Sequence, residues 1–366
     1  MLVMRYVLAA LCWVLISCST STSTSSTERA SAGDGAAIGT GSDPGDGAND
    51  AIANAVGAAL QGNAKRSVQL LEPIQPRSLN TKDRQFRSCM LQRFGDPLAG
   101  PEVSPESPGF AQRLTERYHE YWHASLTQPE SREDTERQLD LHLRRLLGLP
   151  DSAQIDEIEA AVQRRLGAVG LHGLLGRTGV LRELMIWKQE TRKAVQVEMP
   201  HGSYQTRVAF LDDFLVMGWG NYSTCGARGA GGWVAEGTLF AVVPRYESLD
   251  GEAFRVTFLG HETQHFLDLD SYPGIEPWEL EYRAKLVELS LADATRHRVL
   301  RKFLEDQGDD PTSPHSYANR RLLRALVDNL SLPSINALMS VSGESMRAAA
   351  RSLYDADTAS RGARAN

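Results

Sequence analysis

The chain has 366 residues, of which 42% are hydrophobic and 23% are charged. These proportions are those of an ordinary soluble globular protein. The net charge of −7 argues against a nucleic acid as partner, because contacts to phosphates require a basic surface.

Residues 1–17 have the layout of a secretory signal peptide. Arg5 is followed by an unbroken apolar run that is too short to span a bilayer. The run ends in LISC, residues 15–18, which resembles the lipobox of bacterial lipoproteins. The resemblance implies that Cys18 is lipidated and anchors the protein to a membrane of the bacterial cell envelope, facing the periplasm or the surface. The alternative is an ordinary cleaved signal peptide with an incidental cysteine.

Residues 18–50 are nearly all Ser, Thr, Gly, Ala and Asp, without an aromatic residue. Such a segment buries too little apolar surface to fold, so we expect a disordered tether. The roughly 315 residues that follow suffice for one large domain or two smaller ones. Among them, Cys89 and Cys225 either pair in an oxidising compartment or stay separate buried thiols, and their spacing does not decide between the two.

A mainly helical region is predicted for residues 51–195. Apolar and aromatic side chains recur every three or four residues over 109–126, and start and stop signals bracket the segment between Ser131 and Gly148. We interpret 152–170 and 174–195 as further helices of the same kind. His119 and His123 are four residues apart, but without a neighbouring carboxylate we interpret them as packing or surface residues.

The composition changes near residue 196. The segments 204–226 and 231–246 are rich in β-branched and aromatic residues and are separated by glycines, which predicts several strands. A long helix is then expected to begin at Asp250 as N-cap. Side chains at helical spacing share one broad face of this helix and should point inward. They are Phe254, Phe258, His261, Glu262, His265, Phe266 and Leu269.

The letters HETQH at 261–265 have the spacing of a metal site. Side chains four residues apart on a helix stack one turn above the other, so His261 and His265 can present two imidazole nitrogens to one cation. Glu262 is then placed to reach a water on the same ion. We predict that the ion is Zn²⁺, one per chain, and that Glu262 acts as general base.

The third ligand must come from further along the chain. Asp268 and Ser271 stand where a metzincin requires glycine and histidine, so that family is rejected. In the following helix, the spacing Trp-x-x-Glu-x-x-Ala-x-x-x-Glu from Trp278 to Glu288 resembles the gluzincin zinc peptidases, above all their aminopeptidase branch. The resemblance covers 254–292, about a tenth of the chain. It implies that Glu281 is the third metal ligand.

The residues themselves are compatible with that assignment. Glu281 and Glu288 lie beside an apolar stripe formed by Leu280, Ala284, Val287 and Leu291. Alternatively the glutamates lie on a solvated face, and Glu279 and Glu288 are the other candidate ligands.

One departure from the family lies at position 285. Many gluzincins have an aspartate four residues after the ligand glutamate, and this chain has Lys285 there. The group that orients a ligand histidine must therefore come from elsewhere, and the candidates are Asp268, Asp293 or a backbone carbonyl.

Hydrolysis also requires a donor to the developing oxyanion. His315 and Tyr317 are the preferred candidates, because related enzymes use a Tyr or His downstream of the third ligand. The rivals are His297, Tyr272 and Tyr354. Glu236 is the nearest counterpart of the glutamate that grips the free amine in aminopeptidases. We interpret it as an ordinary strand-edge residue, which slightly favours an endopeptidase.

The sequence thus predicts an α+β protein with a zincin-like metallopeptidase core at 196–366, preceded by the helical region at 51–195. The predicted function is zinc-dependent hydrolysis of peptide or protein substrates by a membrane-anchored lipoprotein of the envelope. The alternative is an envelope lipoprotein that serves as a binding or assembly module and has a structural or vestigial zinc site.

Overall fold

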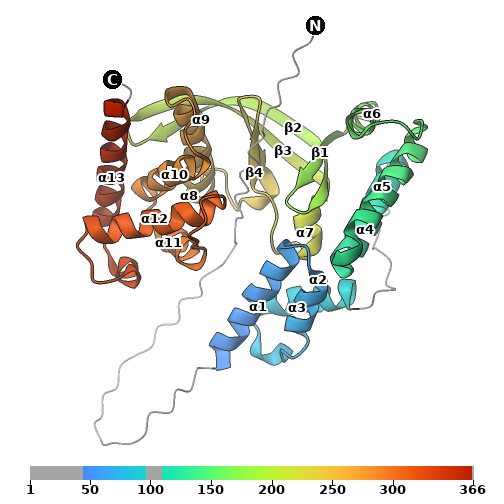
Figure 1. Ribbon diagram of the computed structural model, residues 1–366, viewed down its shortest axis with the longest axis horizontal. Helices are drawn as coiled ribbons and strands as arrows, with labels where there is room; N and C mark the ends of the chain where they lie inside the picture. Colours follow the sequence, from blue (N-terminus) through green and yellow to red (C-terminus); the bar gives the residue numbers. More distant parts are fainter. Residues whose placement is uncertain (1–43, 96–108, 365–366) are drawn as a thin grey trace, which may run out of the picture. The chain divides into compact units, whose positions relative to one another are not determined.

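The computed structural model describes residues 44–95 and 109–364 (Figure 1). The signal peptide predicted at 1–17, the lipidation site predicted at Cys18 and most of the predicted tether lie outside the described residues. The end of the tether is helical instead, because α1 spans Pro44–Leu60. Ile52 and Ala55 on this helix are buried. Their apolar face stabilises the helix, which also includes the small and polar residues that precede it in the sequence.

The chain forms two compact units. The N-terminal unit comprises the described residues up to Gln189 and a returning segment, Asp213–Ala230. The C-terminal unit comprises Glu190–Asp212 and the residues from Gly231 onward. The boundary expected after residue 195 therefore lies inside a strand, because the chain crosses from one unit to the other along two long strands.

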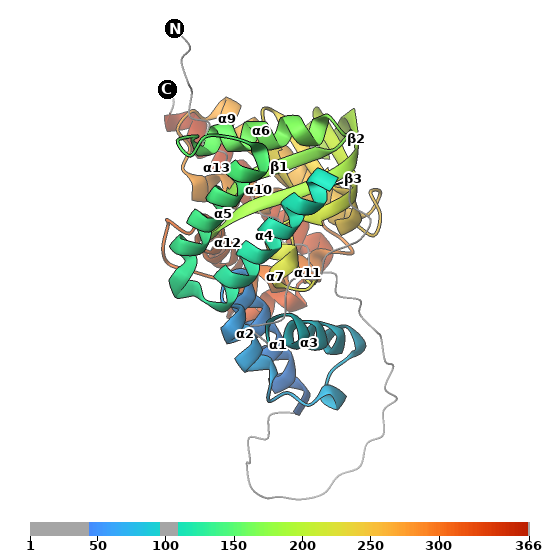
Figure 2. The same cartoon turned by 90° about the vertical axis from the view of Figure 1, so that its right-hand side faces the viewer.

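Helices make up most of the N-terminal unit. After α1 they are α2 Ala64–Leu71, α3 Thr81–Phe94, α4 Gly109–Thr127, α5 Arg132–Leu147, α6 Ile155–Gly167 and the short α7 Trp219–Ser223. Helices α4 and α5 lie side by side (Figures 1 and 2). Gly148 ends α5 with a left-handed φ of 69°, which confirms the predicted stop signal.

The segment 174–195 is not helical, contrary to the prediction. It belongs to β1 His172–Thr178 and β2 Leu181–Met199, which pair antiparallel through a tight turn with Gly179 at φ 55°. The five residues from Glu183 to Trp187, near the start of β2, are all buried, so no alternation of exposed and buried residues marks this part of the strand. Its Leu, Met, Glu and Arg content then resembles that of a helix.

Two sequence questions about the N-terminal unit are settled by its packing. Cys89 on α3 and Cys225 after α7 form a disulfide with a Cα–Cα distance of 6.1 Å. His123 stacks on Phe94, and its Nε2 lies 3.0 Å from the carbonyl oxygen of Arg93, so the packing role predicted for this histidine is confirmed.

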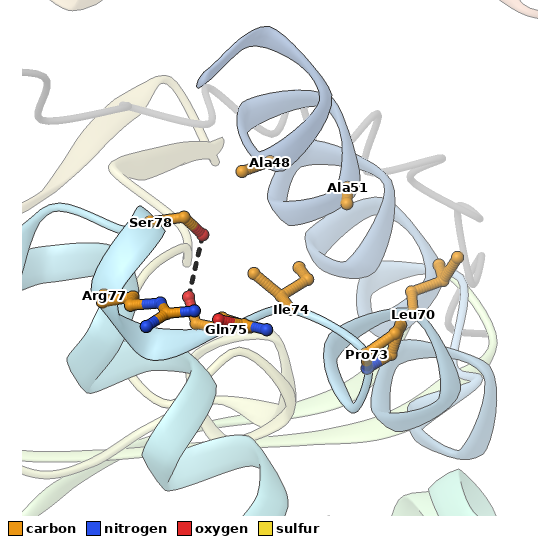
Figure 3. Close-up of a pocket in the computed structure, with 8 residues that line it drawn as sticks. All are labelled: Ala48, Ala51, Leu70, Pro73, Ile74, Gln75, Arg77 and Ser78. Carbon is orange, nitrogen blue, oxygen red and sulfur yellow. Dashed lines mark hydrogen bonds between the residues drawn. The ribbon is translucent and has the colours of Figure 1, made fainter. Parts of the chain in front are cut away.

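A small hollow of about 350 Å³ opens between α1 and the chain after α2 (Figure 3). Its lining is mostly apolar, with Ile74 from the loop and Ala48 and Ala51 from α1. Ser78, which also lines the hollow, donates a hydrogen bond to the carbonyl of Gln75 at 2.8 Å. None of the residues predicted for the metal site lines this hollow.

The strands continue into the C-terminal unit. There β3 Gly202–Met217 pairs parallel with β5 Thr238–Val242, and β4 Gly232–Ala235 pairs antiparallel with β5. The strand order is β1-β2-β3-β5-β4, so β4 is an edge strand. The strands predicted at 204–226 and 231–246 are confirmed, except that α7 and the residues after it replace the end of the first segment.

Helices pack together in the rest of the C-terminal unit. After the three-residue α8 Glu252–Phe254 and the π-helical η4 Arg255–Gly260 come α9 His261–Ser271, α10 Pro277–Leu291, α11 Arg296–Glu305, α12 Pro314–Asn329 and α13 Gly343–Arg364. Helix α10 contacts α9, α12 and α13 (Figure 1). Its buried Leu286 and Leu289 join a cluster with Phe303 of α11 and Leu322 of α12. The α+β class predicted from the sequence is confirmed.

The motif helix differs from the predicted one at both ends. Gly251 rather than Asp250 occupies the N-cap position, and π-helical turns precede His261 instead of one continuous α-helix. Leu269 is 55% exposed and does not share the inward face, because α9 ends at Ser271 and its last turn leaves the core.

Among residues 44–95 and 109–364, no helix is both long and apolar enough to cross a membrane.

The start of α11 depends on a carboxylate from α8. Glu252 accepts hydrogen bonds from the backbone N–H groups of Asp293, Ala294 and Thr295 and from the Thr295 hydroxyl. Burial by itself would raise the pKa of Glu252, but the bonds from Thr295 and its neighbours hold the pKa below its usual value. The carboxylate therefore ties the beginning of the motif helix to the loop after α10.

We expect Glu252→Gln to lower the free energy of unfolding by about 1 kcal/mol at neutral pH, since an amide accepts these bonds less well than a carboxylate. A depressed folded-state pKa stabilises the protein above the unfolded value and is lost as pH falls through the folded value. Urea unfolding should thus separate variant and wild type at about pH 7, and the gap should shrink as the pH falls below the usual pKa of a glutamate. The exposed Asp250→Asn is the control, and a gap that persists at low pH contradicts the assignment.

Candidate metal centre

Three buried side chains from α9 and α10 converge. Nε2 of His261 lies 3.0 Å from Nε2 of His265. Oε2 of Glu281 lies 3.7 Å from the first of these nitrogens, and Oε1 lies 3.4 Å from the second. Each residue is at most 6% exposed. The helical stacking predicted for the histidines and the approach of Glu281 are both present in the structure.

These separations fit a single metal ion. Ligand atoms about 2.0–2.1 Å from a tetrahedral zinc are about 3.3 Å from one another. The distances of 3.0, 3.7 and 3.4 Å lie near that value, and the last two are to different oxygens of Glu281. His261, His265 and Glu281 therefore form a group that could hold a metal ion.

Glu288 orients the first histidine. Its Oε1 lies 2.5 Å from Nδ1 of His261, which leaves Nε2 directed toward His265 and Glu281. A carboxylate on the far nitrogen of a ligand histidine fixes the ring and raises its basicity. Glu288 is two turns after Glu281 on α10, so the two carboxylates reach opposite sides of the same ring.

Neither Asp268 nor Asp293, the two aspartates predicted to orient a ligand histidine, does so. Asp268 accepts hydrogen bonds from Arg283 and Gln264, both at 2.8 Å, and Asp293 pairs with Arg347 at 2.7 Å. Asp268 lies two turns along α9 from His261, and Asp293 lies beyond the end of α10. Glu288, which we considered as an alternative ligand, takes their place.

Glu262 is buried among these groups without a hydrogen bond. Its side chain is 0% exposed, and neither carboxylate oxygen has a hydrogen-bond partner among the described residues. Burial raises the pKa of Glu262, although His261 and His265 act in the opposite direction. A buried carboxylate without a partner is costly, so its presence beside two histidines calls for a chemical explanation.

Glu281 is held by two further groups. The ammonium of Lys285 contacts its Oε2, and Nδ1 of His315 lies 2.8 Å from the same oxygen. Burial by itself would raise the pKa of Glu281, but Lys285 and then the histidines hold the pKa well below its usual range. A carboxylate must be ionised to bind a metal ion, and the lowered pKa of Glu281 favours the ionised form.

Of the residues predicted to stabilise the oxyanion, only His315 lies next to Glu281. The Tyr317 ring packs edge-on against Trp278, with 5.2 Å between ring centroids. Tyr354 donates a hydrogen bond to Gln264, and Tyr272 lies under the Arg283 guanidinium. His297 is an exposed neighbour of Arg296 on α11.

The remaining candidate glutamates have other roles. Glu236 and Gly237 have φ values of 48° and 66° and form the two-residue turn between β4 and β5. Glu236 is therefore an exposed turn residue rather than part of a strand edge. Glu279, the other alternative ligand, pairs with Arg361 at 3.0 Å.

A buried ion cluster fastens both site helices to α13. Arg283 of α10 is 1% exposed and donates to Asp268 of α9 at 2.8 Å and to Asp357 of α13 at 2.6 Å. Tyr354 covers the guanidinium at 4.4 Å and donates to Gln264 on the motif helix. No local pattern in the sequence indicates this cluster, because Arg283 and Asp357 are 74 residues apart.

Removal of this arginine should destabilise the C-terminal unit. We expect Arg283→Met to lower the free energy of unfolding by about 3–5 kcal/mol, because Asp268 is then left buried without its cation. Denaturant unfolding measures the loss. The double variant Arg283→Met with Asp268→Asn should recover much of it, whereas equal losses in both variants would mean that packing, not charge, dominates.

Comparison of the chain with models of protein families, with curated proteins and with solved structures gives no match.

Proposed function

We propose that this protein is a zinc-dependent peptidase whose metal is held by His261, His265 and Glu281 and whose general base is Glu262. The observation that carries the proposal is the buried carboxylate of Glu262, which has no hydrogen-bond partner and lies next to two histidine ligands. A protein retains such a group at a cost of about 1–3 kcal/mol or more. A base that acts on a metal-bound water accounts for that cost.

The donor set supports zinc. Two imidazole nitrogens and one carboxylate are a common ligand set of catalytic zinc sites, in which a water completes the tetrahedron. When bound, zinc lowers the pKa of that water to about 7 and polarises the substrate carbonyl.

Each residue then has a defined task. Glu262, whose pKa is raised by burial, takes the proton of the attacking water and delivers it to the leaving amine. Glu288 keeps the His261 ring in place. His315 is 45% exposed at its side chain and next to Glu281, which favours it over Tyr317 as donor to the oxyanion.

A structural zinc site is the weaker candidate. Such a site is closed by four protein ligands, and the group identified among the described residues has three. A binding or assembly module with a structural zinc also has no use for the buried Glu262. The helices α9 and α10 beside a mixed sheet are what a zincin-like core requires, and this supports the proposed fold family.

Substrate and location are proposed from the sequence and one observation. The disulfide between Cys89 and Cys225 supports an oxidising compartment, which agrees with export and with a lipid anchor at Cys18. The substrates would then be peptides or proteins at the envelope. The place of Glu236 in an exposed turn supports an endopeptidase over an aminopeptidase.

Metal analysis and a peptide digest test the proposal together. Purified protein should contain about one zinc per chain, and a library of blocked peptides should be cleaved in a way that a chelator abolishes and zinc restores. Blocked peptides lack the free amine that an aminopeptidase requires. Metal-loaded protein that cleaves neither blocked nor free peptides would contradict the proposed activity and favour the structural site.

A further inference from the structure

Lys285 is buried beside the metal ligands. Its side chain is 4% exposed, and its ammonium contacts Oε2 of Glu281, one helical turn earlier on α10. The ammonium also lies 5.9 Å from the ring centroid of Phe303 on α11. Lysine is almost never fully buried unless it is paired, so the side chain is held by its carboxylate partner and by an aromatic face.

Three buried carboxylates lie in the surroundings of this lysine. Glu262, Glu281 and Glu288 are 0%, 3% and 7% exposed, and all three lie around the two histidines. Carboxylates packed this closely repel one another unless cations separate them. A divalent ion would supply positive charge when bound. Lys285 supplies one positive charge whether or not the ion is present.

Lys285 and the proposed metal share one carboxylate. The ammonium contacts Oε2 of Glu281, whereas Oε1 is the oxygen nearer to Nε2 of His265. Two cations on the same carboxylate repel each other, and this repulsion is little screened in a buried site. The contact that orients Glu281 therefore opposes tight metal binding.

We propose that Lys285 is an internal counter-ion of the metal centre. As a positioning residue it holds Glu281 in place before the ion arrives, and it weakens the affinity of the site for a divalent cation. The inference rests on the proposed metal-dependent function. It goes beyond that function because it assigns to this lysine the control of metal affinity and of the stability of the metal-free protein.

The test measures zinc affinity by competition with a chromophoric chelator, using the full-length chain. Lys285→Met keeps the length of the stem and removes the charge, and Lys285→Arg keeps the charge. We expect Lys285→Met to bind zinc at least about tenfold more tightly than wild type, and Lys285→Arg to stay within about threefold. Lys285→Gln, which is uncharged but can still donate a hydrogen bond, should also bind more tightly.

Thermal unfolding supplies a second measurement that does not depend on activity. The metal-free Lys285→Met protein should unfold at a lower temperature than metal-free wild type, and added zinc should raise its midpoint by more than it raises that of wild type. If Lys285→Met does not fold without metal, Lys285→Gln decides the result.

The outcomes separate the two proposals. Unchanged or weaker zinc binding by both neutral variants overturns the counter-ion role while leaving the peptidase proposal intact. Failure of the wild-type protein to bind zinc overturns the proposed function itself.

Discussion

Glu262→Gln is expected to keep its zinc and to lose peptide hydrolysis by about 10²–10⁴-fold in kcat/KM. Glutamine has nearly the same shape as glutamate but cannot accept the proton of the attacking water. The three proposed ligands are untouched, so metal content should remain about one per chain. Cleavage of a blocked peptide, measured beside metal analysis of the same sample, checks both parts.

The stability of this variant gives an independent control. Because neither oxygen of Glu262 has a hydrogen-bond partner among the described residues, replacement by a neutral amide should not lower the unfolding temperature. Glu236→Gln, in the exposed turn between β4 and β5, is the matched substitution and should leave hydrolysis unchanged. Full activity of metal-loaded Glu262→Gln protein would remove Glu262 from the mechanism.

His261→Ala is expected to weaken zinc binding by more than about a hundredfold and to abolish hydrolysis. The change removes one of the three proposed protein ligands, and it also leaves Glu288 buried without the ring that it contacts at 2.5 Å. Zinc retained on dialysis against a competing chelator measures the loss. His297→Ala, on the exposed side of α11, is the matched histidine variant and should bind zinc as wild type does.

Glu288→Gln separates the ligand from its orienting partner. We expect this change to weaken zinc binding by about 10–100-fold, less than the loss of His261 itself, because an outer partner adjusts the ligand without contacting the ion. An effect as large as that of His261→Ala would instead make Glu288 a direct ligand.

Local sequence was sufficient wherever neighbouring residues determine the structure. The pairing of His261 with His265 follows from the pitch of a helix, and the end of α5 follows from a glycine that adopts φ 69°. The strands at β4 and β5 follow from β-branched and aromatic residues on either side of a tight turn. In these cases the interacting groups are at most a few residues apart.

Local sequence failed where burial removed the pattern. The part of β2 from Glu183 to Trp187, near the start of the strand, is buried on both faces, so its residues do not alternate and resemble those of a helix. The last turn of α9 shows the reverse, because Leu269 fits the apolar period of the helix but is exposed where the helix leaves the core.

By itself the sequence determined that two histidines and a glutamate share one helical face, and it identified Glu281 as a candidate third ligand through a family resemblance. Only the tertiary structure decided that Glu281 approaches both histidines, that Glu288 rather than an aspartate holds His261, and that Lys285 contacts the ligand carboxylate. The physical reason is that helix periodicity defines which side chains share a face. The distance between faces of different helices depends on how α9, α10, α12 and α13 pack against one another.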